Sequence, residues 1–364
     1  RVGGDGVMAK LGELYKITSG GTPSRTHSEY YEDGTIPWVK TGDLKDKYLF
    51  ETDEKISQLG LENSSARIYL KNTVLLAMYG ATIGATSILK IDAATNQACA
   101  AFSPREDTLP EYLYAFLESQ KDKFIKDAVG GAQPNLSAGY LKTIEFKLPS
   151  LEQQTRITRN LSKIDELLLL RKQQLAKLDE LVKVRFVEMF GDPIGNTKNL
   201  PVTKFVDVVK MQRGFDLPVQ ERKSDGMIPV YGSNGVLGYH DISKVKGGGV
   251  ITGRSGTIGK VFYEKGEFWP LNTTLFSLNS HGNDVVYLKY LLELFDLSRF
   301  TEGTGVPTLN RNKFHDELII DVPLDEQERF AAFVERVDQQ KQTVQQSLEK
   351  LELMKKALMQ EYFG

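Results

Sequence analysis

Two long stretches of the chain carry apolar residues at alternating intervals of three and four positions. The first runs over residues 161–189 and the second over residues 334–362. A sustained period of 3.5 residues is typical of the seam along which two α-helices pack. A proline precedes each stretch and a glycine follows it, as expected at the two ends of a helix. The predicted seam consists of Leu161, Ile164, Leu168, Leu175, Leu178 and Val182, and of Val334, Val337, Val344, Leu348, Leu351 and Leu358.

Basic residues complete both seams, at Arg171 and Arg185 in the first and at Lys341 and Lys355 in the second. The positions of the second seam are those of the first shifted by 173 residues. Each helix alone could simply pack on its own domain. The shared register favours packing of the two helices on each other, antiparallel, with a surface left for further helices.

The remaining sequence predicts mixed secondary structure. Short β-branched or aromatic runs between glycine-rich turns predict strands at Val74–Met78, Val250–Thr252 and Val261–Tyr263. Apolar periodicity predicts short helices at Tyr112–Phe124 and Val285–Phe295.

Four segments recur in the same order, which indicates an internal duplication. Residues 81–84, 130–136, 148–153 and 189–191 match residues 256–259, 303–309, 322–327 and 362–364, at offsets of 173 to 175. The predicted fold class is α/β (α+β): two mixed target-reading domains joined by two long antiparallel coiled-coil helices, with pseudo-twofold internal symmetry. The expected division is 1–7 as the remnant of an expression tag, 8–147 as the first domain, 148–191 as a helical spacer, 192–321 as the second domain and 322–364 as the C-terminal helical spacer.

A helix over residues 161–189 would be about 43 Å long at 1.5 Å per residue. Two globular domains held that far apart match DNA half-sites about 34 Å, or one helical turn, from each other. The two copies differ strongly outside the recurring segments. We therefore expect an asymmetric, split DNA site whose spacer is set by the helices.

Charge and composition exclude several other classes. The net charge of −2 and pI of about 6.2 argue against a protein that coats DNA non-specifically. The single cysteine, Cys99, leaves no disulfide framework and no cysteine zinc site, which suggests a reducing cytoplasm. No apolar run is long enough for a membrane helix, and no secretory signal opens the chain, so a cytoplasmic location is expected.

Candidate DNA contacts come from two glycine-rich stretches without acidic residues, 63–91 and 244–260. Exposed backbone N–H groups and basic side chains there could bind phosphates, although the glycines could also serve hairpin turns alone. Base readout needs Arg, Lys, Asn or Gln on loops, and a merely solvated role is the alternative for each. The candidates are Thr22, Ser24, Arg25, Lys40, Arg67, Lys71, Tyr79, Thr82, Gln133 and Asn135, and Arg213, Asn234, Lys244, Lys246, Arg254, Ser255, Thr257, Lys260, Asn310 and Arg311.

Four other residues are expected to be structural rather than functional. Asn96 and Asn272 each follow the recurring Thr-Ile-Gly segment and precede a strand-like run, which favours turn residues. Trp38 and Trp269 are expected in the core.

Catalytic motifs are missing from the sequence. There is no Asn/Asp-Pro-Pro-Tyr/Phe tetrapeptide of adenine methyltransferases and no phosphate-binding loop. The four histidines lack metal-ligand spacing, and the pair Glu145 and Lys147 resembles a nuclease motif only faintly. We expect no catalytic residues, no bound metal and no cofactor in this chain.

Several segments resemble a known family, the specificity subunits of type I restriction–modification systems. They are Thr18–Arg25 (TSGGTPSR), Ile36–Asp43 (IPWVKTGD), Tyr79–Gly84 (YGATIG), Thr95–Cys99 (TNQAC), Gln133–Leu136 (QPNL) and Leu148–Gln154 (LPSLEQQ). The second copy is looser, with Arg213-Gly-Phe215 and residues 303–309 in place of the tighter motifs.

The resemblance implies two target recognition domains that read the halves of a bipartite site in double-stranded DNA. It implies two methyltransferase subunits that pack on the helices and use S-adenosylmethionine to methylate adenine N6. It also implies restriction subunits driven by ATP and Mg²⁺.

Two other functions stay open from the residues alone. The chain could be a DNA-acting enzyme, either a nuclease or a methyltransferase fragment, or a coiled-coil scaffold without a role on DNA. Activity of the purified chain on DNA with Mg²⁺ and S-adenosylmethionine would favour the enzyme. Failure to bind DNA even with partners present would favour the scaffold.

Overall fold

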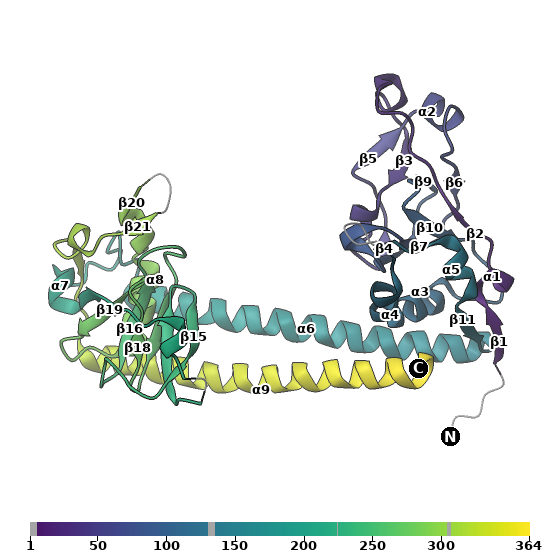
Figure 1. Ribbon diagram of the computed structural model, residues 1–364. Coiled ribbons are helices and arrows are strands. Elements are labelled where there is room, and N and C mark those ends of the chain that lie inside the picture. Colours follow the sequence, from purple (N-terminus) through teal and green to yellow (C-terminus); the bar gives the residue numbers. More distant parts are fainter. Residues whose placement is uncertain (1–5, 130–134, 224, 304–306) are drawn as a thin grey trace. The chain divides into compact units, whose positions relative to one another are not determined.

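The computed structural model describes residues 6–129, 135–223, 225–303 and 307–364. The chain folds as two units, Arg1–Leu170 with Glu349–Gly364, and Arg171–Leu348. Each unit contains one mixed α/β part, which we call its head, and one half of each long helix (Figure 1). The sequence-based division kept each helical stretch as one segment. The units divide both helices because the two halves of a helix pack on different heads.

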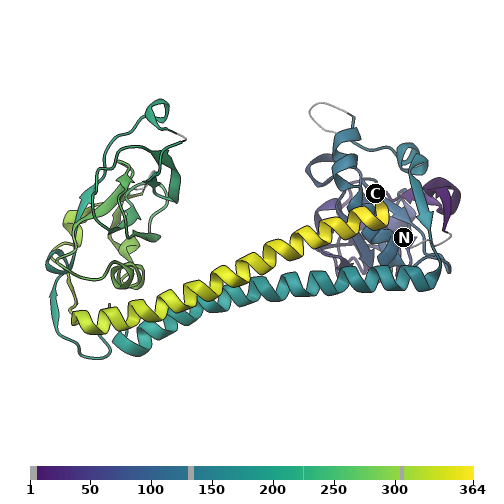
Figure 2. The ribbon, with the colours of Figure 1, turned by 90° about the horizontal axis from the view of Figure 1, so that it is seen from below.

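The two seam stretches form α6 (Leu151–Phe190) and α9 (Leu324–Phe363), each of 40 residues. The chain leaves α6 through Gly191 at φ +75°, a left-handed conformation that glycine adopts without a steric penalty. Figure 2 shows the two helices beside each other within each unit.

Ion pairs give the direction of the helix pairing in each unit. In the first unit, Lys355 Nζ lies 2.6 Å from Asp165 Oδ1, and in the second, Lys341 Nζ lies 2.6 Å from Asp179 Oδ1. A step of two heptads forward along α6 is therefore a step of two heptads back along α9. The helices are antiparallel within each unit, as the shared register predicted.

The twelve apolar seam positions are all buried or half-buried. Val182 and Val334 are fully buried, whereas Leu175 and Leu351, nearer the middle of the helices, are half-buried. The basic interruptions are half-buried too, and the two lysines among them bond to aspartates of the other helix. A seam with such interruptions relies on the heads at its ends for much of its apolar burial.

Replacing Lys341 by leucine should stabilise the second unit by about 1 kcal/mol. The lysine side chain is 29% exposed and its partner Asp179 is 60% exposed, so the lost ion pair contributes little. A leucine in that seam position buries apolar surface instead. Urea denaturation of Lys341→Leu, with Asp179→Asn as the control that removes only the ion pair, measures the change. A loss of more than 1 kcal/mol in both variants would contradict this expectation.

The first head contains an antiparallel pair, β1 with β11, and two larger sheets of order β2-β10-β7-β8-β4 and β5-β3-β9-β6. Alternate residues of the buried strand β7 face two cores: Val74 and Leu76 pack with α3, and Leu75 and Ala77 pack on the opposite face. The elements are β1 (Val7–Lys10), α1 (Leu11–Leu14), β2 (Ile17–Ser19), β3 (Ile36–Val39), β4 (Tyr48–Leu49), β5 (Glu54–Ile56), α2 (Gln58–Glu62), β6 (Ile68–Tyr69), β7 (Val74–Ala77), β8 (Thr86–Leu89), β9 (Ala93–Thr95), β10 (Cys99–Phe102), α3 (Pro110–Ser119), α4 (Lys121–Asp127), α5 (Ala138–Thr143) and β11 (Glu145–Leu148).

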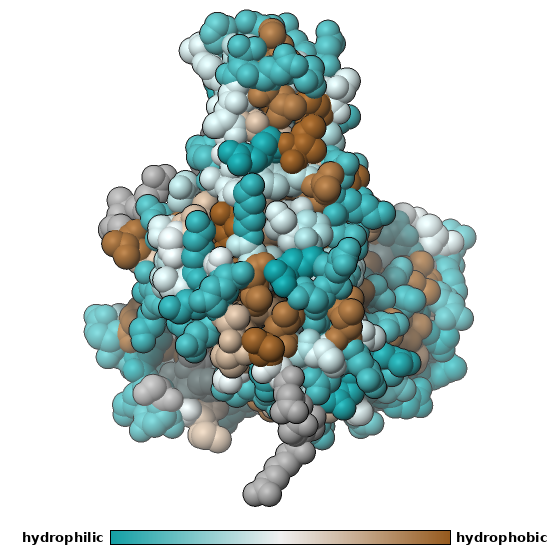
Figure 3. Space-filling model, turned by 90° about the vertical axis from the view of Figure 1, so that its right-hand side faces the viewer, coloured by the Kyte–Doolittle hydropathy of each residue, from teal (hydrophilic) through white to brown (hydrophobic). Residues whose placement is uncertain are grey.

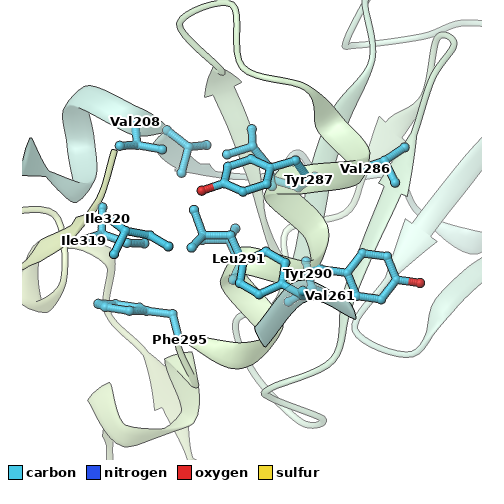
Figure 4. Packing of buried hydrophobic residues seen from close by; sticks show 14 of the residues in the cluster. Val208, Val261, Val286, Tyr287, Tyr290, Leu291, Phe295, Ile319 and Ile320 are labelled. Carbon is cyan, nitrogen blue, oxygen red and sulfur yellow. The ribbon is translucent and has the colours of Figure 1, made fainter. Parts of the chain in front are cut away.

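The second head repeats this plan with the pair β12 and β22 and sheets of order β13-β19-β16-β17 and β15-β14-β18. Its largest core joins α8 to both long helices (Figure 4). The elements are β12 (Val202–Lys204), α7 (Phe205–Val208), β13 (Lys210–Arg213), β14 (Ile228–Gly232), β15 (Gly235–His240), β16 (Gly249–Gly253), β17 (Val261–Glu264), β18 (Trp269–Pro270), β19 (Thr274–Asn279), α8 (Val285–Leu294), β20 (Thr301–Glu302), β21 (Thr308–Leu309) and β22 (Leu318–Ile320).

The repeat is not of constant length. Helix α7 begins 194 residues after α1, at Phe205 against Leu11, whereas α8 begins 175 residues after α3, at Val285 against Pro110. The difference arises early in the heads, because β4 and α2 have no counterpart in the described residues of the second head. The offset of 173 to 175 seen in the sequence therefore applies only from the Thr-Ile-Gly segment onward.

The surface of the first unit in Figure 3 is mostly hydrophilic with separate apolar patches. Exposed apolar side chains there include Phe50, Ile68 and Leu70 on the head and Leu169 on α6. Within the described parts of the chain, no helix has both the length and the apolar character needed to cross a membrane.

Candidate nucleic-acid interface

The first head gathers two candidate basic residues around one acid. Arg25 Nη2 lies 2.6 Å from Glu54 Oε2, and Lys40 Nζ lies 2.5 Å from Glu54 Oε1. The Arg25 guanidinium also lies over the rings of Tyr31 and Trp38, at 4.2 and 5.3 Å from their centroids. Arg25 still has a side chain that is 55% exposed, so this Arg25 cluster can reach a ligand in solvent.

Glu54 tunes the charge of this cluster. Its hydrogen bond raises the pKa of Lys40, and the bond from Lys40 is the main cause that lowers the pKa of Glu54. The basic groups therefore carry their charge, but a carboxylate competes with any phosphate for them. Glu54 lies in the charged run Asp53-Glu54-Lys55, where no sequence pattern distinguished it from a solvated residue.

Thr22 and Ser24 lie on the same exposed loop as Arg25. Thr22 Oγ1 donates to Gln97 Oε1 at 2.5 Å, and Ser24 bonds to Thr26 at 2.8 Å. The loop begins at Gly20, where a Cβ would lie 1.9 Å from the carbonyl oxygen of Thr95. The second head has the same close approach, between Gly214 and the carbonyl of Leu271. Glycine is therefore required at this point in both heads.

The Thr-Ile-Gly segments of both heads form a turn that a later segment meets. In the first head, Asn135 bridges Tyr79, and the Leu136 N–H donates to the Met78 carbonyl at 2.8 Å. In the second, Thr308 bridges Ser255, and the Leu309 N–H donates to the Arg254 carbonyl at 2.7 Å.

The chain therefore brings together candidates that are far apart in sequence. Thr82 belongs to the same turn, because its hydroxyl donates to the Tyr79 carbonyl at 3.2 Å. Gln133 lies outside the described residues.

Arg67 and Lys71 flank the short strand β6, and both are exposed. The backbone N–H of Lys71 donates to Asp92, so an acid adjoins this position as well. No contact in the described residues ties either side chain to the Arg25 cluster.

The second head arranges its basic candidates differently. Lys244 Nζ lies over the rings of Phe215 and Trp269, at 5.6 and 5.0 Å, and Lys246 forms an ion pair of 3.2 Å with Glu267. Arg213 donates to the carbonyl of Asn272 at 3.4 Å. The second head therefore presents a lysine on aromatic rings where the first presents an arginine.

The remaining candidates of the second head lie on its loops. Asn310 caps the turn that contains Arg311, and Arg311 Nη1 donates to the Met211 carbonyl at 3.5 Å. Asn234 and Lys260 are exposed, and Thr257 is half-buried.

The residues expected to be structural are so. Trp38 and Trp269 are 2% and 7% exposed, and Trp38 Nε1 donates to the Gly21 carbonyl at 3.1 Å. Asn96 Oδ1 accepts from the Ala98 N–H at 3.1 Å, which is a local turn bond, and Asn272 donates to Asp216.

Glu54→Gln should raise the affinity of the first head for non-specific duplex DNA by about three- to tenfold at low salt. The substitution removes the negative charge that competes for Arg25 and Lys40. Fluorescence anisotropy with a labelled duplex over a salt series measures it, with Glu51→Gln, an exposed acid, as the control. A weaker affinity of Glu54→Gln alone would show that Glu54 holds the two basic groups in the binding geometry.

Among the described residues, no group of three or more His, Cys, Asp or Glu side chains is arranged to hold a metal ion. The faint nuclease-like pair Glu145 and Lys147 lies on β11, with both side chains exposed.

Comparison with known sequences identifies the duplicated unit. A family model described as the type I restriction modification DNA specificity domain matches residues 5–180 and again residues 198–353. The two matches include nearly all of both heads and most of both helices.

Three curated relatives are specificity subunits of type I restriction enzymes. That of MjaIX from Methanocaldococcus jannaschii is 30% identical over 237 residues, which cover 60% of this chain and 54% of the relative. That of EcoR124I/EcoR124II from Escherichia coli is 26% identical over 43% of this chain and 40% of the relative. That of EcoprrI from Escherichia coli is 22% identical over 92% of this chain and 88% of the relative. The chain thus spans about half the length of the first two relatives.

Two solved structures share the fold. The S subunit of the type I restriction–modification system of M. genitalium matches with a TM-score of 0.59 and 15% identity, over 100% of this chain and 97% of that one. A chain from a study of complex assembly and conformational transition of the type I R-M system matches with a TM-score of 0.69 and 16% identity, over 100% and 99%. With its sequence matched twice by one family model and its fold shared with these structures, this chain belongs to the family of type I restriction modification DNA specificity domains.

Proposed function

We propose that the chain is the non-catalytic specificity subunit of a type I restriction–modification complex. Each head would read one half of a bipartite, asymmetric site in double-stranded DNA. The observation that carries the proposal is the repeated head, which has one strand order in both copies but unlike side chains on the exposed loops. A common scaffold with different reading residues is what two unlike half-sites require.

The DNA-contact residues proposed are those on the loops described above. The Arg25 cluster and the turn at Tyr79–Thr82 would serve the first half-site. Lys244, Arg254, Ser255 and Arg311 would serve the second. Arginine and lysine at loop tips can contact guanine or phosphate, and the aromatic rings beneath Arg25 and Lys244 limit the orientations of their charged groups.

The proposed partners are two methyltransferase subunits and, in a complex that cleaves DNA, restriction subunits. S-adenosylmethionine, ATP and Mg²⁺ would belong to these partners. Apolar side chains exposed on the long helices support docking of further helices there. They are Leu167, Leu169 and Leu170 in the first unit and Leu181, Val184 and Val187 in the second, each more than 40% exposed.

Methylation mapping tests the proposed function. A host that carries this chain with its methyltransferase should show N6-methyladenine at one split motif in single-molecule sequencing. Exchange of residues 200–322 for the matching head of a relative should change one half of the motif and leave the other half unchanged. An undivided or palindromic motif, or methylation by the purified chain alone, would refute the proposal.

A further inference from the structure

Helices α3 and α8 occupy the same place in the two units, and two contacts align them residue by residue. The backbone N–H groups of Leu109 and Asp284, at their N-caps, each donate to a buried glutamine. One turn further on, Tyr112 packs on Phe363 with centroids 5.4 Å apart, and Tyr287 packs on Phe190 at 5.3 Å. This alignment equates Tyr114 with Lys289, Ala115 with Tyr290, and Glu118 with Glu293.

In the second unit this place is filled and neutralised from within. Tyr290 is 7% exposed, and its ring meets Phe330 edge-on at 5.5 Å (Figure 4). Lys289 Nζ lies 2.9 Å from Glu293 Oε2 and 3.6 Å from the centroid of the Tyr290 ring. The second copy therefore supplies both the bulk and the counter-charge for its glutamate.

In the first unit the same place is a cavity of about 220 Å³ between α3, α6 and α9. Ala115 replaces the tyrosine, so the space that Tyr290 fills in the second unit is open. Ala115, Leu161 and Met359 provide apolar wall, and Glu118 provides a carboxylate. A more open hollow of about 410 Å³ shares Glu118 and Met359 with this cavity, so the two form one groove.

The charges in the groove single out Glu118. Asp165 is paired with Lys355 at 2.6 Å, and Glu111 accepts from Tyr48 at 3.2 Å and from Lys90 at 3.5 Å. Among the described residues, Glu118 forms no ion pair within 4 Å, unlike its counterpart Glu293.

Burial raises the pKa of Glu118, with Lys121 and Lys355 only partly offsetting it. A cation placed in the cavity would relieve this cost.

The exposed leucines beside the groove indicate what kind of molecule approaches it. Leu168 lines the open hollow, and Leu167, Leu169 and Leu170 next to it are 42%, 57% and 49% exposed. An apolar helix surface beside a carboxylate-lined cavity suits a protein that presents a long basic side chain, rather than a free small cation.

We propose that this cavity takes the side chain of an arginine or lysine from the methyltransferase subunit. Its aliphatic part would lie against Ala115, Leu161 and Met359, and its charged end would bond to Glu118. The identity of the partner rests on the proposed function, whereas the cationic nature of the occupant rests on the cavity. The second unit would need no such side chain, so the two ends of the molecule would hold their partners unequally.

Transplanting the residues of the second unit tests the site. The double variant Tyr114→Lys/Ala115→Tyr should fill the cavity and neutralise Glu118, and Glu118→Gln should remove the charge alone. Isothermal titration of the whole chain with its methyltransferase subunit should show binding at least about tenfold weaker for both variants. Glu166→Gln, at an exposed position on α6, is the control and should bind as the wild type does. Wild-type affinity in both variants would overturn the proposal.

A second measurement separates the cavity from the partner. A butylguanidinium ion should bind the isolated chain with a Kd in about the millimolar range, seen as a saturable shift of the ¹³C-methyl signal of Met359 in NMR. The shift should vanish in the double variant. Lack of a saturable shift in the wild type would overturn the cationic site. If the methyltransferase does not bind the wild type at all, the proposed function fails, and the butylguanidinium result alone decides the site.

Discussion

Phe330→Ala should lower the free energy of unfolding of the second unit by about 3–5 kcal/mol. The side chain is fully buried on α9, and its ring meets those of Phe186, Phe190 and Tyr290 at 5.4, 5.8 and 5.5 Å. Truncation would leave a cavity where both long helices meet α8, and rigid aromatic neighbours cannot close it.

The chain offers one reporter for each unit, because its two tryptophans, Trp38 and Trp269, lie in different heads. ¹⁹F NMR of protein labelled with 5-fluorotryptophan therefore follows the unfolding of both units in one urea series. The Trp269 signal should lose its native state at lower urea in Phe330→Ala, with the Trp38 transition little changed. Phe333→Ala, three residues along and only half-buried, is the control and should cost less. An equal shift of both signals would show that the units unfold as one.

The helices were the most predictable part of the fold, because a heptad seam is a local pattern that packing does not override. The pairing partners of its basic interruptions were not predictable. Asp165 and Asp179 look like ordinary exposed acids until α9 is placed beside α6. The strands at Val74, Val250 and Val261 were also indicated, because each is a short apolar run between turns. The expected helix over Tyr112–Phe124 is divided at Gln120 between α3 and α4.

The candidate interface was only partly readable from the sequence. Glycine-rich turns and the recurring Thr-Ile-Gly segment pointed to the right loops as exposed features. The acids that hold the basic side chains, Glu54 and Glu267, were missed because cross-strand partners come from distant segments without a fixed spacing. The same limit hid the cavity at Glu118, which becomes visible only when α3 is compared with α8.

The buried glutamines gave the largest difference in alignment. The sequence matches residues 148–153 to 322–327, which equates Gln153 with Gln327. The structure equates Gln154 with Gln327 instead, because these two are 0% and 1% exposed and make the same bonds. Each accepts from the N-cap N–H of the neighbouring helix and donates to a carbonyl five residues earlier in its own chain, at Pro149 or Val322. Repeated residues in a run such as Glu-Gln-Gln can be aligned correctly only from burial.

Gln154→Leu should destabilise the first unit by about 3 kcal/mol or more, and Gln327→Leu should do the same to the second. Gln154 accepts from the Leu109 N–H at 2.8 Å and donates to the carbonyls of Asp107 and Pro149 at 2.9 and 2.8 Å. Leucine keeps the bulk but leaves these buried groups without partners, at about 1–3 kcal/mol for each group that water cannot reach. The same ¹⁹F signals should report each loss in its own unit.

Conservative replacement separates the hydrogen bonds from the volume of the side chain. Gln154→Glu keeps the acceptor for the Leu109 N–H but loses the donor to two carbonyls, so it should also destabilise, with a loss that shrinks at acidic pH when the carboxyl can donate a proton. Gln340→Leu, at an exposed position on α9, should change stability by less than about 0.5 kcal/mol. If Gln154→Leu were as stable as the wild type, this glutamine would only fill space, and the joint between head and helix would depend on apolar packing alone.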